Sequence, residues 1–147
     1  MATAALREGL LARLVTLVAM FWMGSLWTIC AVVATGLFAF LDDRHLAGTI
    51  AGQFFHIATW LGVAFAVVLA ALLGVAGQLS RRHLAWIALA VAPPLANEMG
   101  LLPVMESARQ AGNMALFGSL HLVSVVLFAI AGVGTLVLVL RLTRPAA

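Results

Sequence analysis

Charged residues are scarce in this chain. Only 9% of its 147 residues are charged and 65% are hydrophobic, whereas a soluble domain carries roughly 25% charged residues. A core formed by so short a chain cannot bury this many apolar side chains, so the lipid bilayer must surround most of its surface. The composition therefore excludes an ordinary soluble domain and indicates an integral membrane protein.

The sequence has almost no cysteine and no lysine. Cys30 is the single cysteine, which excludes an intrachain disulfide and a thiolate metal cluster. There is no Gly-rich phosphate loop, HxxxH or CxxC motif, or convincing Ser-His-Asp arrangement, so we do not expect a soluble-type enzyme. All eight basic residues are arginines, a usage typical of GC-rich bacterial genomes. They lie at the ends of apolar segments, so we expect no nucleic-acid partner.

The remaining sequence consists of four long apolar segments separated by short polar ones. A membrane-spanning helix needs about 20 residues, and the segments predict spans at about 14–40, 46–79, 84–103 and 114–140. The first is too long for the apolar region of a signal peptide and lacks a clear cleavage site, so we expect it to be retained. The sequence predicts an all-α integral membrane four-helix bundle that forms one domain over residues 1–147.

The arginines predict the orientation of this bundle. Arginines gather at both chain ends and in the middle loop, while the other two loops have one arginine each beside acidic residues. Cytoplasmic loops carry the excess of positive charge. Both termini are therefore expected in the cytoplasm of a bacterium, and the protein in its inner membrane as a multi-pass protein. The arginines in question are Arg7, Arg13, Arg81, Arg82, Arg141 and Arg144, against Arg44 and Arg109.

The stretch VAPPLANEMGLLP, residues 91–103, interrupts the third apolar segment. Pro93 and Pro94 lack backbone donors, and proline inside a helix disturbs the carbonyl four residues earlier. In hydrocarbon such carbonyls need other partners or must line a polar cavity. We expect the third helix to break at Pro93–Pro94 and to aim Asn97 and Glu98 at polar residues across the bundle.

Three ionisable residues lie inside the predicted spans: His56, Glu98 and His121. At about 1.5 Å of rise per residue, all three fall at comparable depth in the outer half of the bundle. Both histidines lie on polar faces of their helices, which we expect to face the bundle interior. An ionisable residue within a span indicates a functional site, and four-helix bundles place such sites in their cores.

The residue types suggest a metal or haem site. His56, Glu98 and His121 are the predicted metal ligands, and imidazole with carboxylate suits transition metals such as Cu or Zn. Alternatively, His56 and His121 ligate one haem b. The predicted supporting residues are Gln53, Asn97, Ser124 and Arg109.

Other interpretations stay open. The polar residues form a proton or solute relay, or they are hydrogen bonds within an accessory or assembly subunit of a larger membrane complex. Glu98 is also near enough to a loop to pair with Arg109. Gly48 and Gly52 form a GxxxG motif, which serves either packing within the bundle or a homo-oligomer.

Several segments resemble a known family. They are FWMGSLWTICAVVATGLFAFLDDRHLAGTIAGQFFHIATW in the first hairpin, then NEMGLLPVMESAR and FGSLHLVSVVLF. They resemble the bacterial branch of a domain-of-unknown-function family that includes animal transmembrane protein 205, and the resemblance covers about residues 22–128. It implies a compact four-helix membrane protein without an established activity. The link of transmembrane protein 205 to platinum-drug resistance, and a looser likeness to copper-resistance membrane proteins, imply the handling of soft metals.

Overall fold

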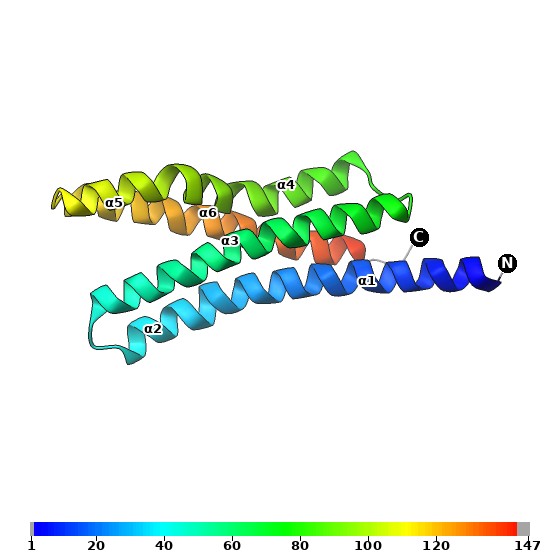
Figure 1. Ribbon diagram of the computed structural model, residues 1–147, viewed down its shortest axis with the longest axis horizontal. Helices are drawn as coiled ribbons and strands as arrows, with labels where there is room; N and C mark the ends of the chain where they lie inside the picture. Colours follow the sequence, from blue (N-terminus) through cyan, green and yellow to red (C-terminus); the bar gives the residue numbers. More distant parts are fainter. Residues whose placement is uncertain (1, 144–147) are drawn as a thin grey trace.

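The computed structural model describes residues 2–143, which form helices joined by short turns. Four helical rods run antiparallel, and each is long and apolar enough to cross a membrane (Figure 1). Within the described residues there is no strand. In chain order the elements are α1 (Ala2–Trp27), η1 (Thr28–Val33), α2 (Ala34–Phe40), α3 (Arg44–Val75), α4 (Arg81–Ala96), η2 (Asn97–Leu101), α5 (Leu102–Gln110) and α6 (Met114–Leu142).

Polar side chains and glycines set the helix ends. Asp43 caps α3 by accepting hydrogen bonds from the backbone N–H groups of His45 and Leu46, and Ser80 and Asn113 cap α4 and α6 similarly. Gly77 and Gly112 adopt positive φ angles of 67° and 70° just past the ends of α3 and α5, a conformation that favours glycine. The third rod continues to Gln110, beyond the span expected to end near residue 103.

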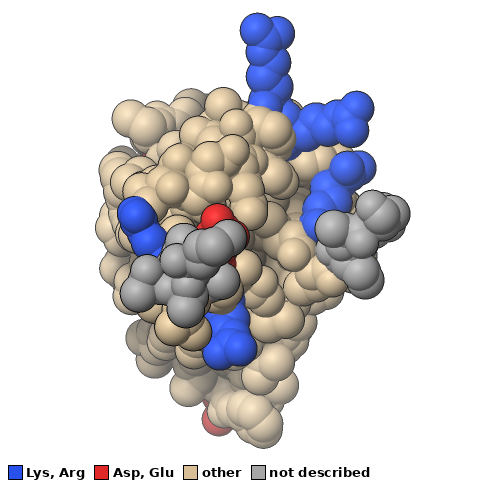
Figure 2. All heavy atoms as spheres, turned by 90° about the vertical axis from the view of Figure 1, so that its right-hand side faces the viewer, with Lys and Arg blue, Asp and Glu red and all other residues tan. Residues whose placement is uncertain are grey.

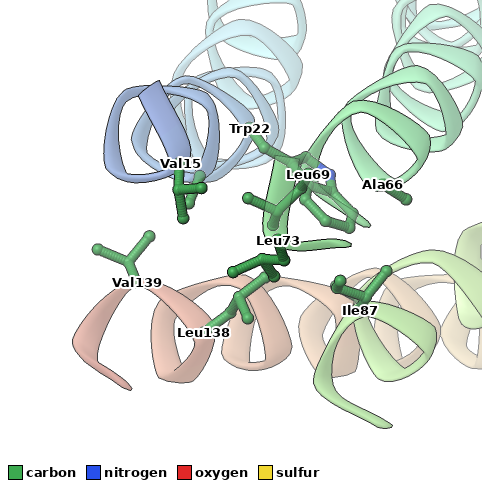
Figure 3. Close-up of a cluster of buried hydrophobic side chains, with 10 residues drawn as sticks. Val15, Trp22, Ala66, Leu69, Leu73, Ile87, Leu138 and Val139 are labelled. Carbon is green, nitrogen blue, oxygen red and sulfur yellow. The ribbon is translucent and has the colours of Figure 1, made fainter. Parts of the chain in front are cut away.

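The half of the bundle near the termini has a continuous apolar core. Buried hydrophobic side chains from α1, α3, α4 and α6 meet there (Figure 3). A second, smaller cluster lies further along the bundle, where the Phe55 and Phe128 rings are 4.7 Å apart. The first cluster consists of Val15, Ala19, Trp22, Ala66, Leu69, Leu73, Ile87, Ala90, Leu138 and Val139.

The other half of the bundle is built differently. There α2 packs on α3 and α5 packs on α6, but neither α2 nor α3 makes a comparable contact with α5 or α6 within residues 2–143. The buried residues of this half are correspondingly local, such as Ala47 on α3 and Met105 on α5. Two hairpins therefore extend beyond the shared core and the Phe55–Phe128 contact, and polar contacts join them.

The third rod is not broken at Pro93–Pro94. Helical backbone runs through both prolines, and the N–H of Asn97 donates to the carbonyls of both. The departure from α geometry follows them, as the π-helical segment η2. A backbone without its helical donors is tolerated where protein covers it, and the α6 backbone at Gly134 lies directly against Leu89 and Ala90, whose carbonyls the prolines leave without donors.

The two ends of the bundle differ in charge. Figure 2 faces the end at which α1 begins, α6 ends and α3 turns into α4, and basic side chains stand out around it. The described arginines of these segments are Arg7, Arg13, Arg81, Arg82 and Arg141. Arg144 lies outside the described residues. The opposite end carries Asp42, Asp43 and Glu106 beside Arg44 and Arg109.

Candidate functional site

His56 and Glu98 are joined across the bundle. His56 Nδ1 and Glu98 Oε1 share a hydrogen bond of 2.5 Å between α3 and η2. The His56 side chain is 50% exposed and the Glu98 side chain 15%. A hydrogen bond that involves an ionised partner is shorter and stronger than one between neutral groups. The carboxylate is thus held by its imidazole partner in the half of the bundle that lacks a continuous apolar core.

The local sequence explains how Glu98 reaches its partner. Glu98 is the second residue of η2, and its neighbour Asn97 is buried with only 3% of its surface exposed. Asn97 therefore fixes one side of the segment against the bundle interior, while Glu98 is turned toward α3. π-helical turns are rare and frequently occur at functional sites. The stretch that follows the two prolines thus aims one polar residue inward and the next at His56.

His121 does not share this contact. It lies on α6, is exposed, and stacks on Phe117 of the same helix with ring centroids 6.2 Å apart. Within residues 2–143 no group of three or more His, Cys, Asp or Glu side chains is arranged to hold a metal ion. The structure brings together two of the three predicted ligands, and the role of His121 stays a prediction.

The predicted supporting residues differ in their burial and in their hydrogen-bond partners. Asn97 Oδ1 is buried and has no hydrogen-bond partner among the described residues. Gln53 is exposed on α3, and Ser124 is partly buried on α6. Arg109 does not pair with Glu98, because its guanidinium forms a salt bridge of 2.9 Å with Glu106.

Two contacts of histidines on α3 were not predicted. His45 accepts a hydrogen bond of 2.9 Å at Nε2 from Arg109 Nη1. This contact is a second polar bridge between the two hairpins. Trp60 lies one helical turn from His56, with its ring centroid 6.4 Å from the imidazole centroid. The spacing of His56 and Trp60 in the sequence is the only signal that could have indicated the second contact.

The expected inward orientation of the polar face of α3, formed by Thr49, Gln53, His56 and Thr59, holds only for Thr59. Thr49, Gln53 and His56 are exposed, and the buried positions of this stretch are Ala51, Ala58 and Thr59. Gln53 and His56 are each two positions from a buried alanine, which is a rotation of about 200° around the helix.

The arrangement has a definite chemistry. An imidazole bound to a carboxylate through Nδ1 has its tautomer fixed, and its Nε2 remains available to a third group. Such a pair can bind a hydrogen-bond donor or a cation at Nε2, and it can take up or release a proton.

The family model that matches residues 17–114 is described as a domain of unknown function, DUF4149. The chain belongs to this family. The match covers most of the chain, including His56 and Glu98, and it confirms the resemblance to a family of unknown function. Neither a curated protein nor a solved structure matches the chain. The DUF4149 chain is thus a polytopic membrane protein whose function must be inferred from its own residues.

Proposed function

We propose that this DUF4149 protein binds a small polar solute or a cation in the outer half of the membrane and couples that binding to a proton on the His56–Glu98 pair. The observation that carries the proposal is the hydrogen bond between α3 and η2. The apolar core of the other half has no buried charged side chain among the described residues, and Thr135, which is buried there, donates its hydroxyl to the carbonyl of Gly132. A binding site open to one side fits this distribution better than a pore, because a pore needs polar groups along its length.

The pair links a proton to a ligand through the two nitrogens of one ring. With Glu98 ionised and Nδ1 protonated, Nε2 of a neutral His56 is an acceptor that can receive a donor or ligate a cation. When a second proton arrives, Nε2 becomes a donor and repels a cation. Ligand release and proton uptake are therefore two consequences of one event at His56.

A metal ion is the narrower form of this proposal. His56 would be a ligand through Nε2, and Glu98 would orient the ring from behind, an arrangement common among metal-binding histidines. A centre that contains His121, with Cu or Zn as the ion, requires α6 to bring that residue to the pair. Haem b between His56 and His121 makes the same demand. Among these bound species, the resemblance to transmembrane protein 205 favours a soft metal ion.

The second candidate function is that of an accessory or assembly subunit of a larger membrane complex. The exposed polar residues on α3 favour it, since polar side chains at membrane depth rarely face lipid. In that case the His56–Glu98 contact stabilises the subunit, and the partner covers α3.

We further propose that both termini are cytoplasmic and that the protein lies in a bacterial inner membrane. The arginines at the end shown in Figure 2 support this orientation. Asp42→Cys, placed in the opposite loop, should then react with a membrane-impermeant maleimide added to spheroplasts. Labelling only after lysis would show that this loop is cytoplasmic and would contradict the proposed orientation.

The binding proposal is tested by native mass spectrometry of protein extracted from its own membrane in lipid nanodiscs. Wild-type protein should carry a bound small molecule or ion that Glu98→Gln and His56→Asn lose. Glu106→Gln is the matched control, because Glu106 is a carboxylate outside the pair. Elemental analysis and a Soret band separate a metal and haem from an organic solute. The same bound species at the same occupancy in wild-type protein and in every variant would contradict the proposal.

A further inference from the structure

A cavity with polar walls lies at the end of the bundle that Figure 2 faces. It is between the first turns of α1 and the end of α3, and its volume is about 460 Å³. Leu11 follows Arg7 by four residues and Glu8 by three, so these three residues share one face of α1. The cavity is lined by Arg7, Glu8, Leu11, Val75, Ala76 and Gln78.

The cavity lies where the apolar part of the bundle ends. Because α1 and α3 run antiparallel (Figure 1), Leu11 and Val75 lie on its inner side, and Arg7 and Gln78 lie on its outer side. Val75 is also the last residue of the apolar helix α3. An apolar wall beneath a polar one matches a phospholipid, whose acyl chains lie beneath its headgroup. The cavity is therefore at the level of the lipid headgroups.

The two charged residues of the cavity have opposite signs. Within residues 2–143 neither Arg7 nor Glu8 forms a salt bridge, so each is available to a bound group. A guanidinium binds phosphate through two parallel N–H···O hydrogen bonds, whereas a carboxylate repels an anion and accepts hydrogen bonds from an ammonium group. A headgroup with negative charge alone would bind Arg7 and be repelled by Glu8.

The end of α3 adds to the negative side of the cavity. The last carbonyls of a helix carry a partial negative charge that favours a cation, and α3 has no basic residue in its last turn. The backbone N–H of Gln78 donates to the carbonyl of Leu73 and closes the turn. The exposed side-chain amide of Gln78 can donate to a phosphate oxygen. The cavity thus suits a ligand that carries one phosphate and one ammonium group.

We propose that this cavity binds the phosphoethanolamine headgroup of a phospholipid. Arg7 and Gln78 bind the phosphate, Glu8 and the end of α3 bind the ammonium group, and an acyl chain contacts Leu11 and Val75. Phosphatidylglycerol has no ammonium group for the carboxylate. Phosphatidylcholine has a trimethylammonium group, which has no N–H to donate. Phosphatidylethanolamine satisfies both charges of the cavity.

Native mass spectrometry of the full chain in micelles with equal amounts of phosphatidylethanolamine and phosphatidylcholine tests the site. Wild-type protein should retain phosphatidylethanolamine about two- to fivefold more than phosphatidylcholine, the factor for one ion pair at an exposed position. Glu8→Gln should abolish this preference and leave the total amount of bound lipid unchanged, because the phosphate contacts remain. Arg7→Gln should reduce the binding of both lipids.

The controls separate this cavity from the basic end of the bundle as a whole. Arg13→Gln changes an arginine of the same helix that does not line the cavity, and it should keep the wild-type preference. Phosphatidylglycerol should bind wild-type protein less than phosphatidylethanolamine does, and Glu8→Gln should increase its binding. Equal retention of phosphatidylethanolamine and phosphatidylcholine by wild-type protein, or an effect of Arg13→Gln as large as that of Arg7→Gln, would overturn the inference.

Free phosphoethanolamine distinguishes a lipid from a soluble solute with the same charged groups. At equal concentration it should not displace the bound lipid, because it lacks the acyl chains that contact Leu11 and Val75. Displacement would assign the cavity to a soluble solute and overturn the proposal of a lipid. The cavity and the His56–Glu98 pair lie in different halves of the bundle, so Glu8→Gln should not change what that pair binds, and the two proposals fail separately.

Discussion

At the scale of single residues, the third rod places two adjacent polar side chains in different surroundings. Glu98 has a partner in His56, and Asn97 has none for its buried Oδ1 among the described residues. A buried polar atom without a hydrogen bond costs about 1–3 kcal/mol. Glu98 therefore stabilises the fold and the Asn97 amide destabilises it, although the two residues are adjacent polar residues in the sequence.

Asn97→Leu should stabilise the protein. The substitution replaces an unsatisfied buried amide with an apolar side chain of similar size, and we expect the free energy of unfolding to rise by about 1 kcal/mol. Denaturation in mixed micelles followed by circular dichroism measures it. Glu98→Leu is the comparison and should destabilise, because it leaves the His56 imidazole without its carboxylate. A loss of stability in Asn97→Leu would mean that Oδ1 is satisfied in the membrane.

At the scale of the elements, the contact between α4 and α6 matters most. Gly134 of α6 lies so close to α4 that an added Cβ would be 3.2 Å from the backbone nitrogen of Ala90 and 3.3 Å from its Cα. Backbone atoms cannot move aside as a flexible side chain can. The close approach lies at the peptide group between Leu89 and Ala90, the two residues whose carbonyls Pro93 and Pro94 leave without helical donors.

Gly134→Ala should therefore separate α4 from α6 and destabilise the bundle by about 1–3 kcal/mol, the usual cost of overpacking. Gly118→Ala is a matched control on the same helix, since its added Cβ would meet nothing within 4 Å. That variant should be neutral or slightly stabilised, because alanine favours a helix more than glycine does. Thermal unfolding in detergent compares the two. Equal melting temperatures would contradict the packing described for α4 and α6.

The number and the approximate positions of the helices could be predicted from the sequence, because helices that face lipid must be apolar along their length. Four spanning helices and their connecting turns were predicted. The extension of the third rod to Gln110 was missed, since ESARQAGN reads as a loop although most of it is helical. The π-helical segments η1 and η2 were missed as well. They arise from a shift in backbone hydrogen bonding that has no pattern in residue type.

At the scale of the whole molecule, the bundle is packed as four helices at one end and as two hairpins at the other. This explains why the candidate site was only partly predictable. Comparable depth correctly indicated a contact between His56 and Glu98. The inward orientation expected for Gln53 and His56 was wrong, because it assumed uniform packing along the bundle. Depth and spacing also did not indicate that His121 is exposed and stacks on Phe117 of its own helix.

The two halves of the bundle differ in what holds their helices together. The apolar core near the termini holds the helices in register. The hairpins at the other end carry the His56–Glu98 and His45–Arg109 contacts. His56 keeps its Nδ1–H donor when Nε2 gains a proton, whereas a proton on His45 Nε2 would remove the acceptor of the second contact.

The central claim is that His56 donates a hydrogen bond from Nδ1 to Glu98 in the membrane. Solid-state nitrogen NMR of histidine-labelled protein in lipid bilayers tests it most directly, with the signal of His56 among the four histidines assigned by its loss in His56→Asn. We predict that His56 has Nδ1 protonated and hydrogen-bonded. Glu98→Gln should shift its signals, and Glu106→Gln should leave them unchanged. A His56 spectrum that is the same in wild-type and Glu98→Gln protein would contradict the account.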